Sequence, residues 1–190
     1  MLQLIFSLLL LTSNPAPAQT LPVNVEKSVV KWEGGSVATT HNGTIFLQSG
    51  SLDVEKGSLI GGRFVIDMNT IINLDVPQAY RGKLENHLKS DDFFGSVTFP
   101  TSQLVIQKAT AQGNDQYLIL ADLTIRGISK PIEFPAKFED NGTGYLASAT
   151  FTFDRAAYEV THRSGSFFQG LGDKLVFDEI TIMVSLEAPR

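Results

Sequence analysis

Most of the chain consists of segments in which apolar and polar residues alternate. Every second residue from Tyr117 to Ile125, for example, is apolar, so that this segment has one apolar face. A period of two is typical of a β-strand with one buried face. The segments that we predict to be strands are 23–33, 37–47, 52–54, 58–70, 101–108, 117–125, 131–138, 145–153 and 175–186.

The connections between these segments are short and contain turn-forming residues. We predict turns at residues 55–57, 126–129 and 141–142, and Asn42-Gly43 can supply the positive φ angles of another tight turn. The long alternation of strands and helices that a parallel sheet requires is missing. The pattern therefore predicts an all-β, antiparallel sheet that closes into a barrel, because closure removes exposed edges. An eight-stranded barrel has an interior that just holds side chains or one slender ligand.

One segment departs from the strand pattern. Residues 79–90 have helical spacing, with Leu84 and Leu88 four apart on one face. The predicted short helix leads directly into Phe93 and Phe94, and two adjacent large apolar side chains need a core or a cavity to enter. We expect this pair to close or line one end of a chamber, with Leu88 packed beneath it. The alternative is that the two rings plug a small core.

Composition restricts the classes of function. The chain has 190 residues, 43% of them hydrophobic and 18% charged, which suits one globular domain. The net charge of −5 and the lack of a basic patch argue against nucleic acid as a partner. The chain has no cysteine, which excludes disulfides, thiolate metal sites and thiol nucleophiles. A domain of this size can bury enough apolar surface to fold without crosslinks.

The first eighteen residues resemble a secretory signal peptide. Leu2 to Leu11 is almost entirely apolar, and Ala16-Pro17-Ala18 fits the small-x-small pattern of a cleavage site. An apolar run of about ten residues is too short for a stable membrane span, which needs roughly twenty. We therefore predict a signal peptide over 1–18, a domain over 19–190, and a periplasmic or secreted protein. The alternative is that the run forms a buried N-terminal strand.

Polar residues that could carry chemistry are scattered along the chain. His41, His87 and His162 stand alone in three distant segments, whereas a metal site needs ligands that converge at short range. Asp91 and Asp92 are adjacent, and adjacent residues do not face one way on a helix. We therefore predict no metal site, no catalytic residue and no enzyme. The alternative that stays open is a hydrolase or isomerase using His87 or His162 with Asp91 or Asp92.

The basic residues Arg155, Arg163 and Lys89 could take part in an ion pair or in phosphate binding. Asp154-Arg155 follows a predicted strand, and we expect a turn there with a local ion pair. His162-Arg163 and Lys89 could instead meet a phosphate at the mouth of a barrel, because Arg and Lys suit phosphate oxygens.

Aromatic residues are more informative than the polar ones. Many lie on the apolar faces of predicted strands, while Phe93-Phe94 and Phe167-Phe168 lie in connections, which usually run over the surface. Such loop pairs could cover or line the mouth of an apolar pocket. The candidate ligand-binding residues are Trp32, Phe64, Ile66, Leu88, Phe93, Phe94, Phe99, Phe134, Phe151 and Phe168.

Two motifs resemble those of the YceI-like family of exported proteins. The first comprises His-Leu-Lys-Ser at 87–90 and Asp-Phe-Phe at 92–94, followed by Thr-Phe at 98–99. The second is the segment 122–131, which is similar to the family's Gly-x-Leu-Thr-x-x-Gly-x-x-Lys-Pro pattern. The similarity covers roughly residues 23–187. One departure is that Leu84 and Glu85 stand where the family often has Arg-Asp.

The resemblance implies an eight-stranded antiparallel, lipocalin-like barrel with one short helix. It also implies a non-enzymatic, periplasmic or secreted protein that binds a long isoprenoid, such as a polyprenyl phosphate or a quinone tail. Three hypotheses follow: a carrier of an apolar or quinone-like lipid without a cofactor, the enzyme described above, and a structural or interaction barrel with a filled core. A homodimer is compatible with a barrel of this family.

Overall fold

The structure is a computed structural model that describes residues 18–190, so the predicted signal peptide lies outside the described residues except for Ala18. Nine strands and one α-helix make up most of this part of the chain. The strands are β1 (Gln19–Pro22), β2 (Val29–Gly35), β3 (Thr40–Glu55), β4 (Ser58–Asn73), β5 (Thr101–Gly113), β6 (Gln116–Ile125), β7 (Ile128–Asp140), β8 (Gly144–Asp154) and β9 (Glu179–Pro189). The helix α1 spans Gln78–Lys89, and 3₁₀ turns lie at Arg155–Tyr158 and Gly172–Lys174.

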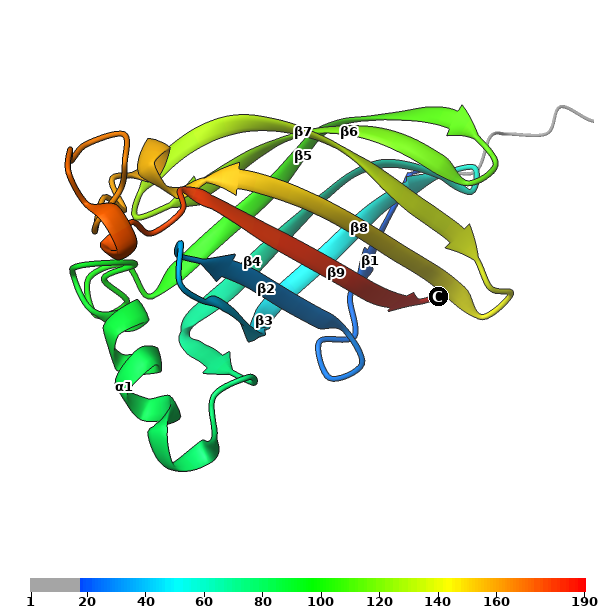
Figure 1. Cartoon of the computed structure of the whole chain (residues 1–190). Coiled ribbons are helices and arrows are strands. Elements are labelled where there is room, and N and C mark those ends of the chain that lie inside the picture. Colours follow the sequence, from blue (N-terminus) through cyan, green and yellow to red (C-terminus); the bar gives the residue numbers. More distant parts are fainter. Residues whose placement is uncertain (1–17) are drawn as a thin grey trace, which may run out of the picture.

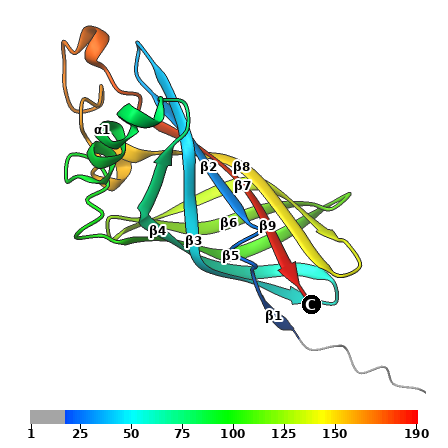
Figure 2. The same cartoon turned by 90° about the horizontal axis from the view of Figure 1, so that it is seen from below.

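The sheet closes on itself. Its strand order is β1-β3-β2-β9-β8-β7-β6-β5-β4, all neighbours are antiparallel, and an additional pairing of β3 with β4 joins the two sides. Strands β2 to β9 therefore form a closed eight-stranded barrel, seen along its side in Figure 1 and from below in Figure 2. The short β1 pairs with the C-terminal part of β3, at residues 51–54. The predicted eight-stranded antiparallel barrel with one short helix is confirmed.

Alternation along the strands places the apolar faces inside the barrel. On β6 the side chains of Ile119, Ala121 and Ile125 are buried, as the alternation predicted. The alternation in the predicted strand 58–70 places Ile60 on the same apolar face as Phe64, Ile66 and Met68, but Ile60 is exposed and Leu59 beside it is buried. The pairing of β4 with β3 shifts at this point, and such a bulge turns the following side chains to the other face.

Strand β3 is continuous through the position where a turn had been possible. Residues 40–55 form one strand with irregularities, in place of the two predicted segments 37–47 and 52–54. Gly43 lies inside it, paired with Trp32 on one side and Asn73 on the other. A Cβ atom at Gly43 would lie 1.9 Å from the carbonyl oxygen of Ile72 and 2.6 Å from the Trp32 ring. The glycine therefore permits close packing and does not form a turn.

Strand ends also differ from the predicted limits. The predicted strand 23–33 corresponds to β2, which begins only at Val29 because the Asn24 side chain accepts hydrogen bonds from the backbone N–H groups of Glu26 and Lys27, which holds a turn there. The last strand begins at Glu179 because residues 172–178 form a 3₁₀ turn and a short extended piece first. In that piece the Phe177 N–H donates to the carbonyl of Gly35.

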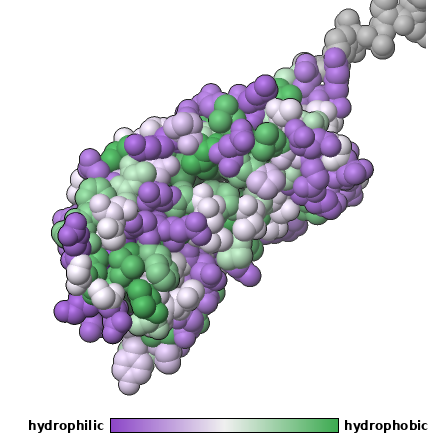
Figure 3. Space-filling model, turned by 45° about the horizontal axis from the view of Figure 1, so that its top comes forward, coloured by the Kyte–Doolittle hydropathy of each residue, from purple (hydrophilic) through white to green (hydrophobic). Residues whose placement is uncertain are grey.

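Two segments outside the sheet lie at the same end of the barrel. The helix α1 and the connection from Arg155 to Asp178 flank this end, on the left of Figure 1. On the face in Figure 3, apolar residues gather at this same left end, while polar residues cover much of the remainder. Among residues 18–190, no helix has the length and apolar character needed to cross a membrane.

We predict that Gly43→Ala destabilises the barrel strongly. The added methyl group meets backbone and ring atoms that cannot give way, and overpacking of this kind costs about 1–3 kcal/mol or more. Urea unfolding of the two proteins measures the difference. Gly82→Ala is the control: it lies within α1, nothing lies within 4 Å of its added Cβ, and it should stabilise by about 0.5–1 kcal/mol. Equal stability of Gly43→Ala and the wild type would contradict the packing described.

Candidate functional site

The interior of the barrel holds a cavity of about 400 Å³. Its walls are mainly aliphatic and aromatic side chains from the strands, and α1 and residues 93–94 contribute at one end. Of the predicted ligand-binding residues, those that line this cavity are Trp32, Phe64, Ile66, Leu88, Phe93, Phe94, Phe134 and Phe151. The arrangement can enclose an apolar molecule and offers it few polar partners.

Two predicted ligand-binding residues lie outside the cavity lining. Phe99 lies beneath Arg126, whose guanidinium carbon is 5.3 Å from the centre of the ring. The same Arg126 donates to the carbonyl oxygens of Asp91 and Phe93, so Phe99 belongs to the support of the Phe93 turn. Phe168 is 49% exposed and borders a separate surface hollow, because its loop runs over the outside of the barrel.

The cavity decides between an open and a filled interior. The filled-core hypothesis required aromatic side chains to pack the barrel to its centre. Instead, Phe134 and Phe151 stack against each other, with ring centres 4.5 Å apart, and line the cavity wall. Toward the other end of these strands, Phe138 stacks on Tyr145 at 4.8 Å, and both rings are buried outside the cavity lining.

The turn after α1 directs the Phe pair into the barrel. The Phe94 N–H donates to the carbonyl of Leu88 at 3.1 Å, and Gly95 has a φ of +57°, so the chain reverses sharply after the helix. Phe93 is buried and Phe94 is half-buried, and both line the cavity. Both stand at the end of the chamber that α1 flanks.

Residues 84 and 85, where the chain departs from its family's pattern, have separate roles. Leu84 faces the cavity and makes its helix side apolar. The Glu85 carboxylate accepts a hydrogen bond of 2.9 Å from the backbone N–H of Asn73, which ties α1 to the end of β4.

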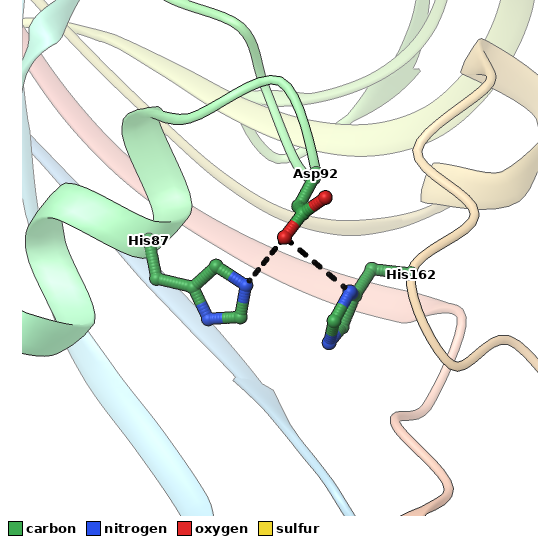
Figure 4. A group of neighbouring side chains, drawn as sticks. All are labelled: His87, Asp92 and His162. Atoms are coloured by element: carbon green, nitrogen blue, oxygen red, sulfur yellow. Dashed lines mark hydrogen bonds and ion pairs between the residues drawn. The ribbon is translucent and has the colours of Figure 1, made fainter.

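Two histidines that are distant in sequence meet at this end of the cavity. Asp92 Oδ2 lies 3.3 Å from His87 Nε2 and 3.9 Å from His162 Nδ1. Figure 4 shows His87 on the last turn of α1, His162 on the loop that faces it, and Asp92 between them. The expectation that each histidine stands alone was therefore wrong for His87 and His162. It holds for His41, which pairs with Asp75 alone at 2.8 Å.

The electrostatic surroundings of His162 favour its neutral imidazole. Burial lowers the pKa of His162, and the neighbouring His87 lowers it further, while the Asp92 carboxylate acts in the opposite direction. His87, Asp92 and His162, three of the four residues named in the enzyme hypothesis, therefore lie together beside the cavity. Asp91 belongs to the outer hollow and accepts from Arg126 through its backbone carbonyl.

Arg155 is the buried centre of the loop that carries His162. Its side chain is 0% exposed and donates to the carbonyl oxygens of Val160, His162, Val176 and Phe177. Burial lowers the pKa of this guanidinium, and the carboxylates of Asp178 and Asp154 oppose that shift.

The ionic partner of Arg155 is distant in sequence. Its Nη2 lies 3.1 Å from Asp178 Oδ1, so the predicted local pair with Asp154 was wrong. Asp154 instead caps the following 3₁₀ turn by accepting from the N–H of Ala156. Asp178 also accepts from the hydroxyls of Ser164 and Ser166 through its other oxygen.

These features define an antiparallel β-barrel with an apolar internal chamber that is flanked at one end by a helix and a braced loop. The chain belongs to the YceI-like family, because the model of the YceI-like domain matches residues 22–188. The resemblance drawn from residues 87–94 and 122–131 is therefore confirmed. A UPF0312 protein of Shewanella denitrificans is 28% identical over 111 residues, which are 54% of this chain and 56% of that relative. The matched part thus spans little more than half of the relative's length.

Solved structures share the fold. The crystal structure of Burkholderia cenocepacia BcnA has a TM-score of 0.71 at 19% identity, covering 87% of this chain and 99% of that one. A polyisoprenoid binding domain from Saccharophagus degradans, implicated in plant cell wall breakdown, has a TM-score of 0.63 at 10% identity, covering 88% and 97%. At these identities the likeness shows the architecture alone.

We predict that Arg155→Met loosens the loop at the barrel mouth. The change leaves the half-buried Asp178 without its cation and four carbonyl groups without their donor, and since breaking a fully buried pair costs about 3–5 kcal/mol, we expect a loss of stability up to that range. Chemical denaturation measures the stability, and amide exchange over residues 159–178 locates the effect. Arg63→Met, at an exposed position of β4, is the control. Unchanged exchange in the loop of Arg155→Met would contradict the bracing role.

Proposed function

We propose that the protein binds a long apolar lipid of the isoprenoid type inside the barrel. The observation that carries this proposal is the cavity of about 400 Å³ with its mainly apolar lining. Each buried methylene contributes about 0.8 kcal/mol, so a long chain can bind with few polar contacts. The polyisoprenoid binding domain of Saccharophagus degradans, which shares the fold, supports the same class of ligand.

The polar residues of the cavity gather where a head group would lie. His87 on α1, and Arg163, Asp173 and Lys174 on the 155–178 connection, contribute to the cavity lining. A polyprenyl phosphate would place its charge near the basic side chains, and a quinone would accept hydrogen bonds from the same groups. Leu84, on the same helix as His87, adds an apolar side chain to this end of the lining. Both head groups therefore remain within the proposal.

The physiological role follows from binding and not from catalysis. A barrel that encloses a lipid tail acts as a carrier or a sequestering protein, and the proposed signal peptide would place it in the periplasm or outside the cell. The candidate ligand-contacting residues are those of the predicted set that line the cavity. A homodimer and the lack of a cofactor stay predictions.

Lipid binding can be tested through Trp32, which is the one tryptophan of the sequence and lines the cavity. We predict that a long-chain quinone added to delipidated protein quenches its fluorescence and saturates at one equivalent. The same quinone without its isoprenoid tail should bind at least tenfold more weakly, because the tail supplies most of the buried apolar surface. Fluorescence titration measures both.

A pair of variants on β8 separates binding inside the chamber from binding outside. Ala149 lines the cavity and Thr150, the next residue, is exposed. Ala149→Phe fills part of the chamber and should weaken quinone binding at least tenfold, whereas Thr150→Phe should leave it unchanged. Equal quenching by both variants, or quenching that never saturates, would sink the proposal.

A further inference from the structure

We propose that His87, Asp92 and His162 form a binding site for a divalent transition-metal ion such as Zn²⁺. Zinc binds imidazole nitrogen and carboxylate oxygen at about 2.0–2.2 Å, so that ligand atoms around one tetrahedral ion lie roughly 3.3–3.5 Å apart. In the structure Asp92 Oδ2 is 3.3 Å and 3.9 Å from the two imidazole nitrogens, and all three ligand atoms lie within 4.8 Å of one another. Small side-chain rotations bring them to metal-ligand spacing.

Packing holds the two imidazoles in place. The Phe93 ring lies edge-on to His87 with centres 4.9 Å apart, and its centre is 5.1 Å from that of His162. The guanidinium of Arg155 fixes the backbone of His162 by donating to its carbonyl oxygen at 3.0 Å. The ligands thus come from separate segments that are each held by contacts of their own, as preorganised sites require.

The charges around the cluster favour a cation. A surface hollow of about 410 Å³ adjoins it and has three carboxylates in its lining, from Asp91, Asp92 and Glu159, against one guanidinium, from Arg163. The buried positive charge of Arg155 is opposed by Asp178 at 3.1 Å. Asp92 itself is 65% exposed in its side chain, so an ion can reach it from this hollow.

The same cluster borders the lipid chamber. His87 and His162 also line the large cavity, whereas Asp92 lines the outer hollow. Three protein ligands leave a fourth position open, as in zinc sites that bind water or a small oxygen ligand. Donors of this kind suit Zn²⁺, Co²⁺ or Ni²⁺ and not Ca²⁺ or Mg²⁺, which prefer oxygen-only sites. Metal binding at this place does not depend on the proposed lipid.

The test uses the full mature protein without an affinity tag, freed of metal with a chelator and of lipid by extraction. Calorimetric titration with Zn²⁺ should give one saturable site, and Co²⁺ should give visible absorption bands of a nitrogen- and oxygen-ligated ion. His87→Ala, Asp92→Asn and His162→Ala should each weaken Zn²⁺ binding at least tenfold. Mg²⁺ should produce no comparable binding.

His41→Ala is the matched control, because His41 also pairs with an aspartate but, within residues 18–190, belongs to no group of three possible metal ligands. It should bind Zn²⁺ like the wild type. The alternative is that the cluster is a hydrogen-bonded brace between α1 and the loop. Thermal melting distinguishes the two, since a bound metal raises the Tm of the wild type and of His41→Ala but not of the three variants. No saturable Zn²⁺ binding, or binding that His41→Ala abolishes and the three variants keep, would overturn the proposal.

Discussion

Closure of the sheet by the pairing of β3 with β4 is the constraint on which the rest of the molecule depends. It leaves β2 to β9 without free edges and places their apolar faces around a common interior. Eight strands give a barrel whose centre side chains can fill or leave open. Here alanines at 136, 147 and 149 stand on the wall of the cavity, while the rings of Phe138 and Tyr145 stack on each other outside its lining. A chamber with one flanked end results.

The end of the barrel beside α1 and residues 155–178 is shaped mainly by interactions outside the strands. Arg155 donates to four carbonyl groups and pairs with the carboxylate of Asp178, all within residues 155–178, and this fixes the shape of that connection. Glu85 ties α1 to β4 on the other side. The 155–178 connection carries His162 and α1 carries His87. The same interactions therefore shape the end of the apolar chamber and bring together the residues of the proposed metal site.

Local pattern was sufficient to predict most of the strands, the helix and most of the apolar faces, although it missed β1 and divided β3 in two. Eight of the ten predicted ligand-binding residues line the cavity, and those on strands could be found because a period of two defines the inward positions. Prediction from local pattern failed where contacts between residues distant in sequence determine the local structure. Gly43 lies in a strand because Trp32 and β4 pack against it, and Ile60 is exposed because of a bulge in the pairing with β3. The Arg155–Asp178 pair and the His87–His162 cluster join residues with no signal in their spacing.

The central claim is that the chamber holds an isoprenoid-type lipid. The most direct test is mass spectrometry of protein isolated without detergent from the cells that produce it, first intact and then after extraction with organic solvent. We predict an adduct of one lipid per chain whose extract contains repeating five-carbon units, and its loss from Ala149→Phe but not from Thr150→Phe. An intact mass equal to that of the polypeptide alone, with no lipid in the extract, would contradict the account.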